Sequence, residues 1–164
     1  MRGKWAQGIP PRNFVWVIKD RLAISERPGG YARNHRRVRR QEEIIWLREQ
    51  GFTQIVSLLP SPHNLHAYDE LGVRWAHFPV APTDDSRQVL ADLYRQLREW
   101  LGAGERLLLH QEELGDRLMG VVGGYLLFAG LLDSGPKAIT VVEQLTSRQM
   151  GPVGRELVAV SATL

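Results

Sequence analysis

The chain contains no cysteine among its 164 residues. This absence excludes disulfides, thiolate metal sites and a thiol nucleophile, and it leaves the cellular compartment open. Residues 1–10 also lack the apolar run of a signal peptide, so we expect no secretion signal and a cytoplasmic protein.

Long hydrophobic runs are scarce as well. The longest, residues 118–132, is broken by glycines and falls short of the roughly 20 residues of a membrane span, so it predicts a buried helix and no transmembrane segment. With 43% hydrophobic and 24% charged residues, the composition is that of one globular domain with a sizeable core.

The net charge is also small, at +3, but the basic residues are unevenly distributed along the chain. Five arginines form a basic patch: Arg33, Arg36, Arg37, Arg39 and Arg40. Such a patch could face nucleic acid, phosphoinositide headgroups or a phosphoprotein. It could equally be a solvated helix start in which Arg39 pairs with Glu42 or Glu43. We do not favour nucleic acid, because the five tryptophans are spread too widely to form a stacking surface.

Hydrophobic patterning predicts strands that alternate with helices. Strands are expected at residues 14–18, 22–24, 52–59, 73–80 and 107–109, the first two as a hairpin. Helices are expected at residues 38–50, 66–71, 86–101, 118–132, 137–147 and 153–162. This order predicts an α/β fold in one domain, a three-layer sandwich whose central, mostly parallel sheet carries helices on both faces. Residues 1–13 are expected to be a flexible N-terminal arm, and residues 14–164 the domain.

The stretch 107–120 combines a short buried strand, a polar loop and a buried helix. This arrangement directs backbone N–H groups and a helix N-terminus at one point, which attracts anions such as phosphate. Arg117, in the first turn of the expected helix, could clamp the same anion, or it could form a structural ion pair with Glu112, Glu113 or another carboxylate.

The run His110-Gln111-(five residues)-Arg117 resembles the active-site loop of cysteine-dependent protein tyrosine phosphatases, particularly the dual-specificity branch. That loop has the form His-Cys-(five residues)-Arg. The order of elements is similar too: a hairpin, the helix-into-strand run LREQGFTQIVSL, the strand ending HFPV, an acidic loop and the anion loop. The resemblance covers residue 14 to the C-terminus and implies the fold of that family.

The resemblance also implies roles for particular residues. It assigns phosphate or anion binding to Gln111, Glu112, Glu113, Leu114, Gly115, Asp116 and Arg117, and orientation of the loop to His110. It offers Asp84 or Asp85 as a general acid. Each has a structural alternative: His110 could be a satisfied core histidine, and Asp85 or Ser86 could cap the following helix.

Gln111 stands where the family has its nucleophilic cysteine. An amide cannot attack phosphorus, so the phosphocysteine mechanism is closed and we expect no catalytic residue. Leu114 and Asp116 replace glycines of the family loop, and Leu118 replaces its Ser or Thr. Glu112, Glu113 and Asp116 add negative charge, which weakens anion binding.

The sequence therefore predicts a catalytically inactive pseudophosphatase that binds a phosphate-bearing or anionic ligand, or a phosphoprotein. Two alternatives stay open. One is a phosphoester hydrolase in which Glu112, Glu113 or Asp85 activates water; the other is an interaction module with a vestigial anion loop. We expect no cofactor and no metal, because His63 and His66 lack a clear third ligand.

Overall fold

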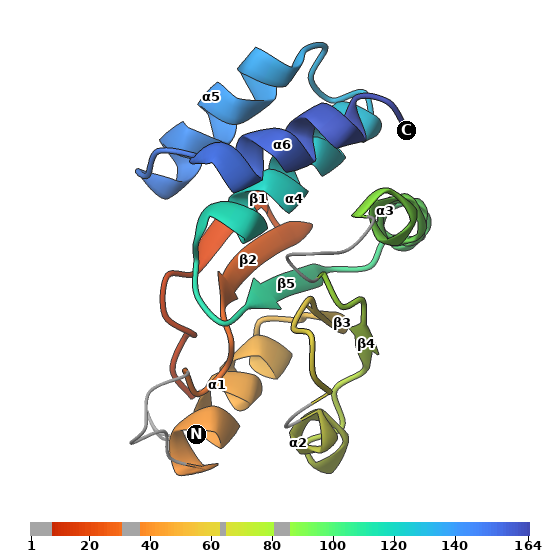
Figure 1. Cartoon of the computed structure of the whole chain (residues 1–164). Coiled ribbons are helices and arrows are strands. Elements are labelled where there is room, and N and C mark those ends of the chain that lie inside the picture. Colours follow the sequence, from red (N-terminus) through yellow and green to blue (C-terminus); the bar gives the residue numbers. More distant parts are fainter. Residues whose placement is uncertain (1–7, 31–36, 63–64, 81–85) are drawn as a thin grey trace.

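The computed structural model describes residues 8–30, 37–62, 65–80 and 86–164. Within these ranges the chain forms β1 (Val15–Ile18), β2 (Leu22–Glu26), α1 (Arg37–Glu49), β3 (Gln54–Ser57), α2 (His66–Glu70), β4 (Trp75–His77), α3 (Ser86–Gly102), β5 (Leu107–Gln111), α4 (Asp116–Phe128), α5 (Gly135–Thr146) and α6 (Pro152–Ser161) (Figure 1). Each expected strand and helix is present, with shifted ends.

One sheet connects the five strands in the order β1-β2-β5-β3-β4. The predicted hairpin is confirmed, since β1 pairs antiparallel with β2, while the pairs β2–β5, β5–β3 and β3–β4 are parallel. The sheet is therefore mixed and mostly parallel, as predicted. β5 lies at its centre, so the loop that follows β5 leaves from the middle of the sheet's carboxyl edge.

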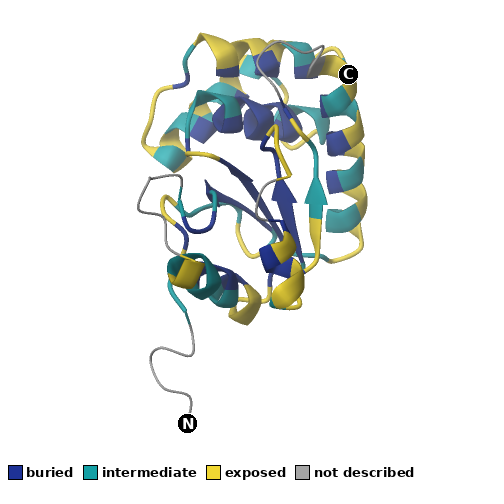
Figure 2. Ribbon diagram, turned by 60° about the horizontal axis from the view of Figure 1, so that its bottom comes forward, coloured by how far each residue is buried: buried dark blue, intermediate teal, exposed yellow. Residues whose placement is uncertain are grey.

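Alternate residues of the central strands supply two separate cores, because successive side chains of a strand point to opposite faces. Leu22, Ile24, Val56, Leu107 and Leu109 pack with α3, α4, α5 and α6, whereas Ala23, Ile55 and Leu108 pack with α1 and α2. Figure 2 shows the buried residues on the strands and on the inward sides of the helices. Helices thus cover both faces, which confirms the predicted class.

Helix α4 lies between the sheet and the pair α5 and α6 (Figure 1), and nine of its residues are buried. Its glycines make room for close neighbours, and at Gly120 the neighbour is another backbone. A Cβ on Gly120 would lie 2.5 Å from Cα of Gly154 in α6, and one on Gly124 would collide with the hydroxyls of Tyr94 and Ser161. Gly120 therefore lets α4 and α6 pack backbone to backbone, whereas Gly124 makes room for two side-chain hydroxyls.

The expected boundaries around the anion loop are wrong by a few residues. β5 continues to Gln111 instead of ending at residue 109, since Glu26 pairs with Gln111 in the ladder. α4 begins at Asp116 instead of residue 118, because Gly115 is its extended N-cap and an acidic residue suits the first helical turn. It ends at Phe128 instead of residue 132; Gly130 then adopts a left-handed φ of 73°, as residues after helices often do.

The described part of the expected N-terminal arm bonds to the domain. The Ile9 N–H donates to the carbonyl of Glu42 at 3.3 Å, and the carbonyl of Arg12 accepts the Glu26 N–H at 3.0 Å. The flexible arm at residues 1–13 stays a prediction, and its residues 1–7 lie outside the described ranges. Of the helices described, none has both the length and the apolar character to cross a membrane.

Candidate functional site

The candidate site lies where β5 ends and α4 begins. The connecting residues 112–115 leave the centre of the sheet and enter α4 through Gly115, whose φ of −123° and ψ of −169° are extended. No side chain caps this helix. Its first N–H groups therefore remain available at the carboxyl edge of the sheet, where ligands of α/β proteins commonly bind.

Gln111 forms the base of this site. Its side chain is only 7% exposed, and its Nε2 donates to the carbonyl of Leu58 at 3.0 Å. The bond connects the end of β5 to the chain just after β3. A buried amide held in this way is fixed in place and offers no nucleophile.

The four loop residues point in different directions. Glu112 and Glu113 are exposed, and Glu112 pairs with Arg27 at 3.5 Å. Leu114 is 2% exposed and belongs to the larger core, while its carbonyl accepts a hydrogen bond from Arg148 at 2.9 Å. Leu114 therefore anchors the loop through its side chain.

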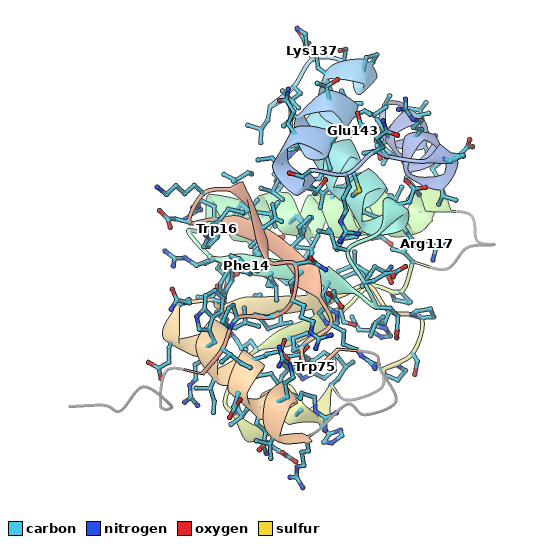
Figure 3. All side chains as sticks on the ribbon, turned by 90° about the vertical axis from the view of Figure 1, so that its left-hand side faces the viewer. Phe14, Trp16, Trp75, Arg117, Lys137 and Glu143 are labelled. Carbon is cyan, nitrogen blue, oxygen red and sulfur yellow. The ribbon has the colours of Figure 1, made fainter. Side chains whose placement is uncertain are left out.

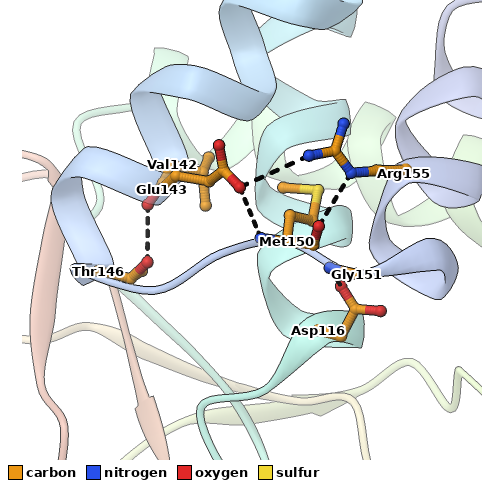
Figure 4. A network of polar contacts seen from close by, with 7 residues as sticks. All are labelled: Asp116, Val142, Glu143, Thr146, Met150, Gly151 and Arg155. Carbon is orange, nitrogen blue, oxygen red and sulfur yellow. Dashed lines mark hydrogen bonds and ion pairs between the residues drawn. The ribbon is translucent and has the colours of Figure 1, made fainter.

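Asp116 belongs to a polar network that holds residues 148–155 against the start of α4 (Figure 4). Its Oδ1 accepts the Gly151 N–H at 2.6 Å. One residue earlier, the Met150 N–H donates to Glu143 at 2.7 Å, and Glu143 also pairs with Arg155 at 3.7 Å. The Asp116 carboxylate is thus engaged within the fold, which lowers its availability to any ligand.

An open cavity of about 350 Å³ lies over this junction. Its polar wall comprises Gln111, Glu112, Glu113, Gly115, Asp116 and Arg117, and its apolar wall comprises Pro60, Leu118 and Val153. The volume falls in the range of small-ligand sites. All the loop residues assigned to anion binding except Leu114 therefore line one cavity, called the loop cavity below.

Arg117 lies beside the start of α4, well apart from the aromatic pair Phe14 and Trp16 (Figure 3). The structure shows no hydrogen bond or ion pair of Arg117 with any residue it describes, so the predicted alternative of an ion pair with Glu112 or Glu113 is not found there. A half-buried guanidinium without a partner beside a helix N-terminus is suited to an anion.

His110 lies beneath the loop, in the smaller of the two cores. Its side chain is 1% exposed, and its Nε2 is 3.3 Å from the Tyr68 hydroxyl. Burial lowers the pKa of His110 to about 4, so the ring is neutral at physiological pH. The ring therefore connects β5 to α2 through Nε2, while its Nδ1 is left without a partner among the described residues.

The described members of the basic patch are partly paired within the fold. Arg39 pairs with Glu43 at 3.4 Å, one of the two predicted partners, and Arg37 lies 3.5 Å from Glu70. Burial and the nearby charges of Arg27 and Arg37 lower the pKa of Arg40. Cations therefore gather at the start of α1.

Several predicted residues lie outside the described ranges: Arg33 and Arg36 of the basic patch, His63, and the two candidate acids Asp84 and Asp85. No group of three or more His, Asp or Glu side chains that could hold a metal ion occurs in the described part of the chain.

Sequence reasoning missed Arg27, whose side chain is 15% exposed and contacts the loop through Glu112. Arg27 follows β2, which is the parallel neighbour of β5. Since the carboxyl ends of parallel strands meet at one edge, an arginine just after a strand was a usable signal once the strand order was known. The strand order itself cannot be read from hydrophobic periodicity.

No protein-family model matches the sequence, and no curated protein matches it either. Solved structures do match in fold. The active form of Tk-PTP superposes with a TM-score of 0.74 at 19% identity, covering 92% of this chain and 97% of that one. The kinase-associated phosphatase with its catalytic-site cysteine changed to serine gives 0.74 at 20% identity, covering 88% and 90%.

Human DUSP28 gives a TM-score of 0.69 at 19% identity, covering 95% of this chain and 96% of that one. At these identities the likeness establishes the fold, a single-domain α/β arrangement that matches dual-specificity phosphatase structures along nearly the whole chain.

Proposed function

We propose that the protein is a catalytically inactive dual-specificity-phosphatase-like domain, a pseudophosphatase, that binds a phosphorylated or anionic ligand in the loop cavity. A phosphoprotein is the partner class that suits this role. The observation that carries the proposal is the position of Gln111, at the end of the central strand, at the base of the cavity and held by the carbonyl of Leu58.

The chemistry of Gln111 argues against turnover by the family's mechanism. That mechanism needs a thiolate, whose pKa a helix N-terminus lowers, to attack phosphorus and form a covalent intermediate. The Gln111 amide has no nucleophilic electron pair at neutral pH, and its N–H group is already donated to the protein backbone. The absence of a nucleophile at this position supports ligand binding without covalent catalysis.

The surroundings of the cavity support anion binding. The uncapped N-terminus of α4 and the guanidinium of Arg117 both favour negative charge. Two of the three nearby carboxylates are engaged elsewhere, Asp116 with the Gly151 N–H and Glu112 with Arg27. The acidic residues therefore oppose an anion less than their number suggests.

Thermal unfolding tests the binding. Phosphate, sulfate and tungstate are added at fixed ionic strength to the wild-type protein, to Arg117→Ala and to Arg95→Ala, an exposed arginine on α3 that serves as the matched control. An anion at ten times its Kd should stabilise by about 1.4 kcal/mol and raise Tm by about 3–6 °C. The shift should be lost in Arg117→Ala and kept in Arg95→Ala. An unchanged Tm in every anion would contradict the proposal and support an interaction module with a vestigial loop.

A second experiment measures hydrolysis of an aryl phosphate and a phosphopeptide. We expect no turnover above background. Glu113 supports the competing water-activated hydrolase, because its carboxylate lines the cavity and no described residue pairs with it. Turnover that disappears in both Arg117→Ala and Glu113→Gln would replace the pseudophosphatase proposal with that hydrolase.

A further inference from the structure

Some charged side chains that line the loop cavity interact with other described residues, and others do not. Glu112 is held by Arg27 at 3.5 Å, and Asp116 accepts the Gly151 N–H at 2.6 Å. Both interactions direct these carboxylates toward protein partners. The electrostatic character that a ligand meets is therefore set by the remaining charged residues of the wall.

Those residues are Glu113 and Arg117, one of each sign. Neither forms a hydrogen bond or an ion pair with a described residue, and they do not pair with each other. The Glu113 Oε1 lies 3.5 Å from the position that a Cβ on Gly115 would occupy, so this carboxylate lies over the N-cap of α4. The cavity consequently presents one unpaired cation and one unpaired anion to the same ligand.

Gln111 adds a neutral acceptor. Its orientation is fixed, because a backbone carbonyl can only accept and so the atom 3.0 Å from the Leu58 oxygen must be the amide nitrogen. The opposite atom, Oε1, accepts from no described donor, although the side chain is 7% exposed. A carbonyl oxygen at the base of the cavity repels a phosphate oxygen and attracts an N–H group.

We propose that the ligand of the loop cavity is a phosphomonoester with a positively charged nitrogen beside its phosphoryl group. The phosphoryl oxygens face Arg117 and the N-terminus of α4, and the N–H donors face Glu113 and the Gln111 Oε1. This inference rests on the proposed anion-binding function and narrows it. Two sources share the chemistry: a small amino-alcohol phosphate, and a phosphorylated side chain next to a lysine.

An isosteric pair of ligands tests the inference. O-phosphoethanolamine and n-propyl phosphate differ mainly in an ammonium that replaces a methyl group, and their Kd values are measured by calorimetry at fixed ionic strength. Wild type should bind O-phosphoethanolamine about two- to fivefold more tightly, the size of an exposed ion pair. Glu113→Gln should abolish this preference without weakening n-propyl phosphate. Glu156→Gln, an exposed carboxylate on α6, should keep the preference.

The outcomes separate this inference from the proposed function. Equal affinity of the wild type for both ligands, or a preference that persists in Glu113→Gln, overturns the inference and leaves anion binding intact. Failure of both ligands to bind overturns anion binding as well. Two further probes, phosphoserine peptides with lysine or alanine beside the phosphoserine, identify the source. Tighter binding of the lysine peptide than of O-phosphoethanolamine assigns the ligand to a protein, and the reverse order assigns it to a small molecule.

Discussion

Helix α4 meets its surroundings in opposite ways at two places. At Gly120 it touches α6 so closely that an added Cβ would lie 2.5 Å from Cα of Gly154. At its N-terminus, about one turn away, it borders the open loop cavity, where Glu113 and Arg117 pair with no described residue. The first region has no room for an added methyl group, whereas the second has open space lined by charged side chains.

The difference shows how the same helix can serve stability and binding. Close backbone contact fixes where α4 begins, because shifting the helix would separate it from α6. A fixed N-terminus holds its N–H groups and Arg117 in position, although Arg117 forms no ion pair with a described residue. These groups are therefore preorganised for a ligand. The tight contact between α4 and α6 thus allows the loop cavity at the N-terminus of α4 to stay open.

The largest loss of unfolding free energy should come from adding a methyl group at the contact between α4 and α6. Gly120→Ala places a Cβ against the backbone of α6, which cannot move as a flexible side chain could, so we expect a loss of about 3 kcal/mol of unfolding free energy. Gly102→Ala, at the end of α3 where a Cβ would meet nothing within 4 Å, is the control and should change stability by under about 1 kcal/mol. Denaturant unfolding measures the unfolding free energy of both variants. Similar losses in the two would contradict the close packing inferred at Gly120.

The pH dependence of the unfolding free energy tests the burial of His110 beneath the cavity. Because the folded-state pKa of His110 is lowered from 6.5 to about 4, the unfolded state binds more protons between these values, and stability falls as the pH falls through this window. From pH 7 to pH 5 the loss attributable to His110 should be about 2 kcal/mol.

The variant His110→Gln isolates that loss. Burial raises the pKa of Glu43 and so gives a slope of opposite sign, but Glu43 is present in both proteins and cancels in their difference. If unfolding free energy has the same pH dependence in wild type and variant, protonation of His110 costs no stability. The region beneath the cavity would then be accessible to solvent.

Asp116 connects the two regions, so its loss should have an intermediate effect. Asp116→Ala removes the acceptor of the Gly151 N–H and an acidic group at a helix N-terminus, and should cost about 1–2 kcal/mol. Asp133→Ala, whose exposed ion pair with Lys137 at 3.0 Å contributes little, is the matched control. Equal destabilisation by the two variants, again in denaturant unfolding, would show that the network of Figure 4 does not hold α4.

The smallest effect should come from Arg117. Without a partner among the described residues, Arg117→Ala should change the unfolding free energy by under about 0.5 kcal/mol in anion-free buffer. A cost above 1 kcal/mol would reveal an intramolecular role and weaken the contrast. The same variant is expected to abolish stabilisation by anions, which separates binding from folding.

The sequence determined much of this architecture, because hydrophobic periodicity directly reports which elements have a buried face. Strands, helices, their order and the burial of α4 followed from local patterns, and the motif from His110 to Arg117 predicted an anion site at this loop. The absence of cysteine from the sequence excludes the thiolate mechanism.

Only the tertiary structure decided which charges of the loop are available. Glu112, Glu113 and Asp116 are equivalent in the sequence, yet one meets Arg27, one meets the Gly151 N–H and one stays unpaired over the N-cap of α4. Their partners come from the residue after β2 and from the segment before α6, both distant along the chain. Pairing between distant segments depends on how the sheet and helices pack, and local sequence patterns carry no record of it.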